Sequence, residues 1–301
     1  MADLTNPIFN DEAKARKHFE GLRWPEGRYC PHCGEAERTS PVAGQSVGLY
    51  YCNSCKKKFS ATVGTVYERS HIPLHKWLAA THLMASSKKG MSAHQIHRLL
   101  GITYKSAWFM CHRIREAMVD QTPEPMGGNG ETIEVDETYI GRRKGAKVRK
   151  GGAHKNTVLT LVSRDGSARS FHVDGTSAAE LLPYVYKNIL RNTNIMTDEA
   201  HPYKRLGETF ASHQSVNHGA EEYVRGAVYT NTVEGFFSIF KRGMKGVYQH
   251  CSEKHLHRYL AEFDFRYSNR KITDAERAGL AVTGARTKRL TYRQPPSAKA
   301  S

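Results

Sequence analysis

The sequence has no long hydrophobic run, no internal repeat and no extended low-complexity segment. A membrane-spanning helix needs roughly 18 or more apolar residues, and no stretch approaches that length. The N-terminal MADLTNPIFNDEAKARKHF carries early acids and lacks the apolar segment of a secretory signal. We therefore expect a cytoplasmic protein. Its 301 residues suffice for two domains, or for one sizeable domain with appendages.

Acidic residues are scarce relative to basic ones. The chain has 45 lysines and arginines against 29 aspartates and glutamates, a net charge of +16. Residues 141–155 hold seven basic residues and no acid, and residues 241–301 hold fourteen basic residues against five acids. These two segments account for the whole excess. Such concentration favours a polyanionic partner, most often nucleic acid, and predicts a nucleoid-associated protein.

Cysteine is rare, but four of the six cysteines form two Cys-x-x-Cys pairs with eighteen residues between them: Cys30, Cys33, Cys52 and Cys55. This spacing is typical of a zinc ribbon, in which four thiolates hold a structural Zn²⁺ and leave no open position. Two disulfides or unliganded core thiols are the alternatives, and a cytoplasmic compartment disfavours disulfides. We expect His32 to be a bystander and Cys111 and Cys251 to be ordinary thiols.

A helix-turn-helix pattern lies between the cysteines and the middle of the chain. In MSAHQIHRLLGITYKSAWFMCHRIREAM, Ser92 is expected to cap a first helix, Gly101 to make the turn, and Thr103 to start a second helix. The inward-facing residues of the first helix would be Ile96, Leu99 and Leu100. The second helix, expected in a major groove, would carry Lys105, His112, Arg113 and Arg115. A plain helical hairpin packed on the zinc module is the alternative.

The hydrophobic pattern of the sequence changes after a Pro/Gly-rich linker, QTPEPMGGNGE. TIEVDETYIG alternates at period two, as a half-buried strand does, and further strand-like and helical runs follow. This order predicts a mixed α/β domain. The predicted divisions are an N-terminal helix (1–25), a zinc ribbon (26–62), a helical DNA-binding region (63–122), a linker (123–130), the α/β domain (131–270) and a basic, partly disordered tail (271–301).

Three acids stand at the ends of ordered-looking elements in basic surroundings: Asp136, Asp198 and Glu234. Converging carboxylates repel one another unless cations neutralise them, and Mg²⁺ takes oxygen ligands and bridges to phosphates. A structural role is equally compatible with Asp136 and Asp198 taken alone. The neighbouring acids Glu134, Glu137 and Glu199 could be surface charges or salt-bridge partners.

The third acid belongs to a helix with an apolar stripe of Val233, Phe236, Phe237, Phe240 and Met244. The alternative role for Glu234 is a capping box, because Asn231 precedes it by three residues. Lys241 lies on the same polar face, about 10 Å further along the helix axis. That separation is too long for a helical ion pair, so Lys241 is a candidate to hold a substrate phosphate.

Taken together, these motifs resemble bacterial insertion-sequence transposases of the DDE class, in the ISXO-like branch with an N-terminal zinc ribbon. The resemblance rests on CPHCG…YYCNSCKKKFSATVGT, IEVDETYIGRRKG, TDEAHPY and NTVEGFFSIFKRGMKGVYQH, and covers nearly the whole chain. It implies an RNase H-like catalytic domain in which Mg²⁺ or Mn²⁺ bound by Asp136 and Asp198 cleaves DNA and transfers strands. Family members carry an acid or an amide at the third position. We favour Glu234 over Asn231, since a carboxylate neutralises metal charge.

The resemblance predicts a transposase that binds the terminal inverted repeats of its element in double-stranded DNA, as a homo-oligomer. Lys241 matches the basic residue that follows the third position. Phosphate contacts are expected from the loop after the first aspartate (Arg142, Arg143 and Lys144), unless that loop is merely solvated, and from the last helix (Arg258, Arg266 and Arg270). The competing hypotheses are a non-catalytic or domesticated DNA-binding regulator and a metal-dependent nuclease without strand transfer.

Overall fold

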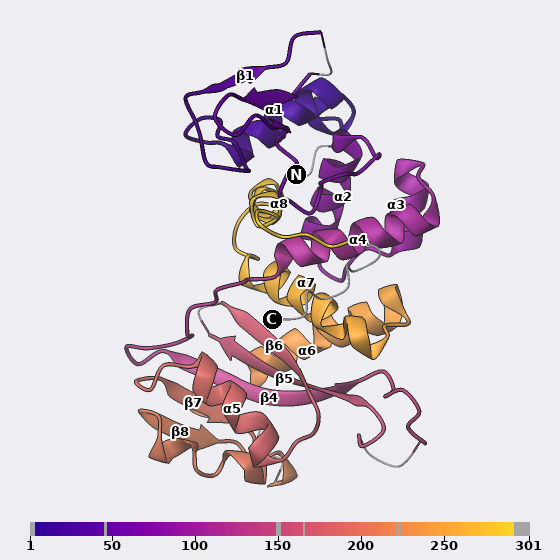
Figure 1. Cartoon of the computed structure of the whole chain (residues 1–301). Coiled ribbons are helices and arrows are strands. Elements are labelled where there is room, and N and C mark those ends of the chain that lie inside the picture. Colours follow the sequence, from indigo (N-terminus) through magenta and orange to yellow (C-terminus); the bar gives the residue numbers. More distant parts are fainter. Residues whose placement is uncertain are drawn as a thin grey trace, which may run out of the picture. The chain divides into compact units, whose positions relative to one another are not determined.

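The computed structural model describes residues 4–44, 47–148, 152–164, 166–220, 222 and 224–291. The chain divides into two compact units (Figure 1). One comprises residues 1–87, 91–119 and 272–301, and the other residues 88–90 and 120–271. None of the helices in the described ranges combines the length and the apolar character needed to cross a bilayer.

The second unit is built on a five-stranded mixed sheet. Its strands are β4 (Thr132–Ile140), β5 (Asn156–Ser163), β6 (Ala168–Val173), β7 (Asn194–Thr197) and β8 (Ser212–Ser215). Their order is β6-β5-β4-β7-β8, so β4 is central. β4 pairs with β5, and β5 with β6, in antiparallel fashion, whereas β7 runs parallel to both β4 and β8. The mixed α/β domain expected from the sequence is thus confirmed.

Helices cover both faces of this sheet (Figure 1). α5 (Ala178–Asn188) packs on one face, where Ile133 and Val135 of β4 point. α6 (Asn231–Gly243) and α7 (Leu256–Ser268) cover the other face, which receives Ile140. The expected apolar stripe of α6 is buried in this second core. Alternation along β4 therefore decides which of its side chains lie beneath α6.

Short elements connect these parts. They are the 3₁₀ turns η2 (His201–Tyr203), η3 (Leu206–Glu208), η4 (His218–Ala220) and η6 (Glu253–His255), the small hairpin of β9 (Val224–Arg225) and β10 (Val228–Tyr229), and the π-helical turn η5 (Met244–Tyr248) that continues α6. Part of the expected linker is ordered: Met126 is buried in the α5-side core and bridges to Ile189.

In the first unit, a three-stranded antiparallel sheet carries the cysteine pairs. It consists of β1 (Thr39–Pro41), β2 (Tyr50–Cys52) and β3 (Lys58–Phe59). The preceding elements are η1 (Pro7–Phe9) and α1 (Glu12–Arg23). Trp24, just after α1, makes edge-to-face contacts with the rings of Tyr50 and Phe59, and the Tyr50 hydroxyl donates to Glu20. These contacts attach the ribbon to α1.

Four helices complete this unit: α2 (Leu74–Ser86), α3 (Ala93–Leu100), α4 (Tyr104–Met118) and α8 (Asp274–Thr283). The expected local signals of the helix pair are present. Ser92 accepts a hydrogen bond from the Gln95 amide and caps α3, Gly101 ends α3 in the left-handed region, and Thr103 accepts from the Ser106 amide and caps α4. The prediction that Leu99 faces inward is wrong, since it is 57% exposed.

The expected disordered tail begins with an ordered helix. α8 starts with a capping box between Thr273 and Glu276, and packs on α2. Basic residues here donate to backbone carbonyls at helix ends: Arg277 to Ala85, Arg286 to Leu22 and Arg23, and Lys288 to Ala117 and Val119. Part of the positive charge counted in this segment therefore stabilises helix C-termini. Residues 292–301 of the expected tail lie outside the described residues.

Candidate active site and metal centre

The first two candidate acids lie on neighbouring parallel strands. The last register pair of β4 and β7 is Glu134 with Met196. Asp136 and Asp198 each lie two residues further along their strands, so the register carries them to the same level of the sheet. Asp136 belongs to the central strand, and Asp198 directly follows the end of β7. The ends of parallel strands are a frequent location for sites in open α/β sheets.

Alternation along β4 divides its three acidic residues between the two faces of the sheet. Glu134 and Asp136 share the face covered by α6, whereas Glu137 belongs to the α5 face together with Ile133 and Val135. The Glu137 carboxylate accepts a hydrogen bond from the Tyr203 hydroxyl. Glu137 is therefore hydrogen-bonded on the α5 side of the sheet. Of the two neighbouring acids Asp136 and Glu137, Asp136 is the one that faces α6.

The electrostatics link Asp136 to the other two candidate acids. Burial raises the pKa of Asp136 to about 8, and the negative charges of Asp198, Glu137 and Glu234 add to this rise. Partial burial lowers the pKa of the Lys241 ammonium, and the Asp136 carboxylate opposes that shift. Since such effects act over short range in a protein, Asp198, Glu234 and Lys241 all lie in the electrostatic neighbourhood of Asp136.

Glu134 fixes the start of α6. Its fully buried carboxylate accepts hydrogen bonds from the amides of Thr232 (2.8 Å) and Val233 (2.9 Å) and from the Thr232 hydroxyl (2.8 Å). Arg164 donates to the same carboxylate at 2.9 Å and stacks over the Tyr229 ring. A carboxylate from β4 thus occupies the N-terminus of α6, where free amides and the helix dipole favour negative charge. The sequence left open whether Glu134 is a surface charge or a salt-bridge partner, and the structure shows that it forms a salt bridge with Arg164.

This arrangement removes the capping-box alternative for Glu234. The N-cap of α6 is Thr230, which makes no side-chain cap hydrogen bond, and Asn231 is already the first helical residue. The amides that a cap would bind are taken by Glu134. Glu234 and Asn231 are both exposed, and Lys241 is half-buried with its Nζ 5.8 Å from the Phe237 ring centroid. The polar face of α6 is therefore available for chemistry.

The donor set fits a hard divalent cation. The candidate ligands are carboxylates, which suit Mg²⁺ or Mn²⁺. A cation would offset the burial and the charge repulsion that together raise the pKa of Asp136. Within the described ranges, the only group of at least three Cys, His, Asp or Glu ligands that is already close-packed is the cysteine cluster. The three acids are neighbours that a cation would have to draw together.

The four paired cysteines do form a preassembled metal site. Their ligand atoms all lie within 4.8 Å of one another, with sulfur–sulfur distances of 3.6 Å for Cys30–Cys55 and 3.7 Å for Cys33–Cys52. Sulfurs at the corners of a tetrahedron with Zn–S bonds of about 2.3 Å lie about 3.8 Å apart. None of these four cysteines forms a disulfide. The arrangement fits a structural Zn²⁺.

The neighbours of the cluster are consistent with that role. The pKa of Cys52 is lowered to about 7, chiefly by the backbone amide of Cys55, which favours the thiolate. The other sequence expectations for cysteine and histidine also agree with the structure. His32 is outside the cluster, with Nε2 3.4 Å from the Lys58 carbonyl oxygen, and Cys111 is buried in α4.

The basic residues expected to contact DNA fall into two groups. Arg142, Lys144 and Arg270 are exposed, and Arg143 and Arg258 are half-buried. Arg113 and Arg266, in contrast, are each only 6% exposed. The Arg113 guanidinium donates to the Glu68 carbonyl and stacks on Trp77, and Arg266 pairs with the buried Glu262. These two arginines serve packing, because helix periodicity carries them to the inner face.

The exposed polar surface of α4 lies nearer to its N-terminus than the sequence pattern predicted. Lys105 is exposed at the start of α4, but His112, Arg113 and Arg115 are buried. Tyr104 is 43% exposed and stacks on His94 of α3 with centroids 4.1 Å apart. The first turn of α4 therefore presents Tyr104 and Lys105. The only sequence signal for this exposed pair was its place at the N-terminus of the second helix, because the second helix of a helix-turn-helix contacts bases with its N-terminal residues.

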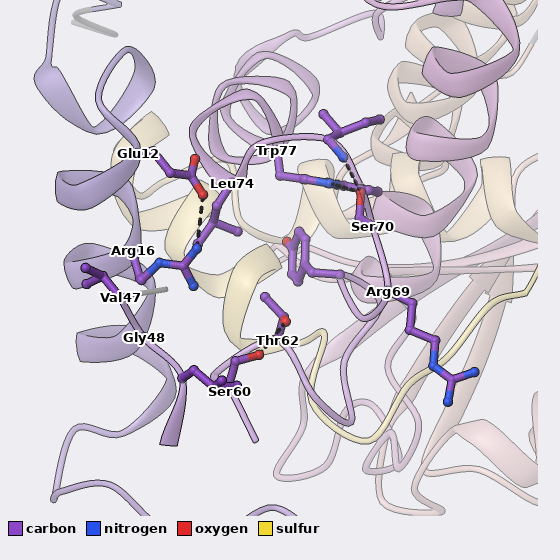
Figure 2. Close-up of a pocket in the computed structure, with 13 residues that line it drawn as sticks. Glu12, Arg16, Val47, Gly48, Ser60, Thr62, Arg69, Ser70, Leu74 and Trp77 are labelled. Carbon is purple, nitrogen blue, oxygen red and sulfur yellow. Dashed lines mark hydrogen bonds and ion pairs between the residues drawn. The ribbon is translucent and has the colours of Figure 1, made fainter. Parts of the chain in front are cut away.

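A polar cavity of about 250 Å³ lies in the first unit between the ribbon, α1 and α2 (Figure 2). Arg16 and Glu12 form an ion pair beside it, and Glu12 also accepts from His75. The Trp77 indole donates to the Ser70 hydroxyl. These bonds connect α1 to the first turn of α2, and α2 to the segment that precedes it.

Comparison with known proteins agrees with these two modules. Residues 128–268 match the ISXO2-like transposase domain, and residues 10–58 match the transposase zinc-ribbon domain. A curated relative, described as an uncharacterized protein in transposable element ISH50 of Halobacterium salinarum, is 27% identical over 278 residues, covering 86% of this chain and 91% of the relative.

A solved structure, the intasome of simian T-cell lymphotropic virus in complex with the PP2A regulatory subunit B56 gamma, aligns with a TM-score of 0.30 at 16% identity, over 56% of this chain and 63% of that chain. The two matched domains place the chain among transposases of insertion sequences. It belongs to the ISXO2-like transposases that carry an N-terminal zinc ribbon.

Proposed function

We propose that this protein binds the terminal inverted repeats of an insertion sequence and catalyses metal-dependent DNA cleavage and strand transfer. The observation that carries the proposal is the convergence on Asp136. Asp198 reaches its level through the parallel register of β4 and β7, and the charges of Asp198 and Glu234 both raise its pKa. Raised pKa values of grouped carboxylates are typical of functional sites.

The sheet supports an RNase H-like assignment of the second unit. Three antiparallel strands, β6, β5 and β4, are followed by two parallel strands, β7 and β8, with helices on both faces. In the proposed site, Asp136 on the central strand would hold the cations together with Asp198 and Glu234. Bound Mg²⁺ or Mn²⁺ supplies the activation of water and the stabilisation of attacking and leaving oxygens.

The chain's own groups then position the DNA. Lys241 holds a phosphate beside the acids, and the exposed Arg142, Lys144 and Arg270 bind phosphates of the backbone. In the first unit, the helix-turn-helix presents Tyr104 and Lys105 to the major groove. Both element ends must be processed together, so the active species is a homo-oligomer on DNA.

A cleavage assay on an end-containing duplex tests the proposal. Cleavage is expected with Mg²⁺ or Mn²⁺ and not with EDTA. Asp136→Ala should abolish cleavage while keeping DNA binding, and the exposed Asp174→Ala, with the same charge change, should leave cleavage intact. Binding without any metal-dependent cleavage would favour a DNA-binding regulator. Cleavage without joined products, when a target duplex is added, would favour a nuclease.

A further inference from the structure

A cavity of about 280 Å³ lies in the second unit beyond the end of β4. Its floor includes Ile140, Met244 and Leu256, all of which belong to the core beneath α6 and α7. Its rim carries Lys155, at the entry to β5, and Lys245, in the π-helical turn. An apolar floor with a cationic rim fits a ligand that has both a flat apolar part and a negative charge.

Two amide side chains also line this cavity. Asn156 is 2% exposed, and its Oδ1 is buried and accepts no hydrogen bond from the described residues. Leaving a buried carbonyl oxygen unpaired costs on the order of 1–3 kcal/mol. Gln249 follows the π-helical turn with φ of 57°, a backbone conformation that favours glycine. An unpaired acceptor and a residue held in a strained conformation at one cavity indicate a ligand.

The cavity lies next to the candidate active site. Burial lowers the pKa of Lys241, on the polar face of α6; the Asp136 carboxylate opposes this shift, and the positive charges of Lys245 and Lys155 add to it. Lys245 lies one helical turn beyond Lys241. The positive charges of Lys155, Lys241 and Lys245 therefore form a continuous group from the acids to the cavity rim. A chain of phosphates that passes Asp136 can follow this group of charges.

We propose that this cavity receives one nucleotide of the DNA strand that runs past Asp136, with its base turned out of the duplex. The base lies on the floor of Ile140, Met244 and Leu256, and its polar edge donates to the Asn156 Oδ1 and bonds with the Gln249 amide, because the Asn156 Nδ2 already donates to the Ile140 carbonyl. Its phosphates lie against Lys155 and Lys245. Amide side chains read base edges well because they carry both a donor and an acceptor. The proposal rests on DNA as the substrate of the second unit.

The experiment places 2-aminopurine singly at each position around the cleaved phosphodiester of an end-containing duplex. The full-length protein is added with Ca²⁺, so that binding is followed without turnover. One position is expected to show a several-fold rise in fluorescence on binding, because an unstacked 2-aminopurine is no longer quenched. No rise at any position, with binding verified by anisotropy, would overturn the proposal.

Variants assign the signal to the cavity. Gln249→Gly removes the amide at a backbone position that suits glycine, so it should fold normally and lose most of the fluorescence rise. Lys245→Ala should lose it as well. Lys187→Ala, which removes an exposed lysine on α5, on the opposite face of the sheet, should retain it. Equal losses in the Lys245 and Lys187 variants would mean a general charge effect and contradict the assignment.

Two further measurements complete the test. One distinguishes a nucleotide of the DNA strand from a free nucleotide as the ligand, and the other distinguishes the cavity proposal from the proposed catalysis. Excess free deoxynucleoside monophosphates should leave the signal unchanged, because the bound strand presents its own nucleotide at high effective concentration. Loss of the signal would identify a pocket for free nucleotides and overturn the DNA-strand assignment. Cleavage is measured on the same duplexes with Mg²⁺. A signal without cleavage would refute the proposed catalysis alone, and cleavage without a signal would refute the pocket alone.

Discussion

The carboxylate of Glu134 accepts both the amide and the hydroxyl of Thr232, at 2.8 Å each. This one residue of the central strand thereby determines where α6 begins, and with it the position of Glu234 two residues further on. The same strand carries Asp136 two residues beyond Glu134. A single rigid connection thus relates the first and third candidate ligands, which lie almost a hundred residues apart in the sequence.

Glu134→Gln tests this connection. An amide nitrogen would replace one of the two oxygens that face Arg164, Thr232 and Val233, which leaves donors without acceptors. We expect a loss of about 2–4 kcal/mol in the free energy of unfolding, measured by urea denaturation, and reduced cleavage under conditions where the protein remains folded. Glu131→Gln, at an exposed position just before β4, is the control and should change stability little.

The raised pKa of Asp136 predicts a pH-dependent stability. The pKa is about 8 in the folded protein against 3.8 for an aspartate side chain in water. Between those values the folded state binds more protons than the unfolded state, so stability falls as pH rises. In metal-free buffer, Asp136→Asn should be more stable than the parent protein by several kcal/mol at pH 8, with the difference vanishing near pH 4. Thermal melts across that range measure it.

Magnesium should reverse the order of stability of the parent protein and Asp136→Asn at pH 8. A bound cation neutralises the repulsion that destabilises the parent protein, so saturating Mg²⁺ should raise the melting temperature of the parent at pH 8 and leave Asp136→Asn nearly unchanged. A parent protein that is as stable as the variant at pH 8 without metal would contradict the electrostatic account of the site.

The third ligand can be assigned by paired substitutions on α6. We expect Glu234→Gln to lower the cleavage rate about 10²–10³-fold, the range for removing one group that stabilises charge in a transition state. Asn231→Ala should have a much smaller effect. Single-turnover cleavage with saturating DNA measures both, and DNA affinity should remain unchanged. The reverse order of effects would place the amide at the third position.

Zinc removal should unfold the ribbon. Structural zinc sites contribute about 10–16 kcal/mol of binding free energy, which a short three-stranded sheet cannot replace. One zinc per chain is expected by metal analysis of the natively purified protein. A strong chelator should abolish hydrogen-exchange protection in residues 29–62, and Cys251→Ser should retain its zinc. Purified protein without zinc, yet with a protected ribbon, would refute this role.

Several local sequence signals correctly predicted local structure. Cysteine spacing predicted the four-sulfur cluster, Ser92, Gly101 and Thr103 marked the ends of two helices, and the aromatic stripe of α6 identified its buried face. Each of these features depends on residues a few positions apart, whose relative geometry is set by helix or turn periodicity. The mixed α/β domain followed from the order of the same signals.

Side-chain orientation on a helix with several basic residues was less predictable. Arg113 and Arg266 look like DNA contacts in the sequence, but both are buried and bonded within their own units. Charge alone does not reveal which face of a helix packs inward. The same holds for Arg277 and Lys288, which donate to helix carbonyls instead of remaining in solvent.

The sequence by itself determined the zinc ligands, the family and which acids are candidates, because these depend on residue type and spacing. Only the tertiary structure decided how those acids are arranged. The parallel register of β4 and β7 sets Asp136 and Asp198 at one level, and the buried Glu134 carboxylate fixes the start of α6. Register and helix placement arise from packing between distant segments, and that information is absent from any short stretch of sequence.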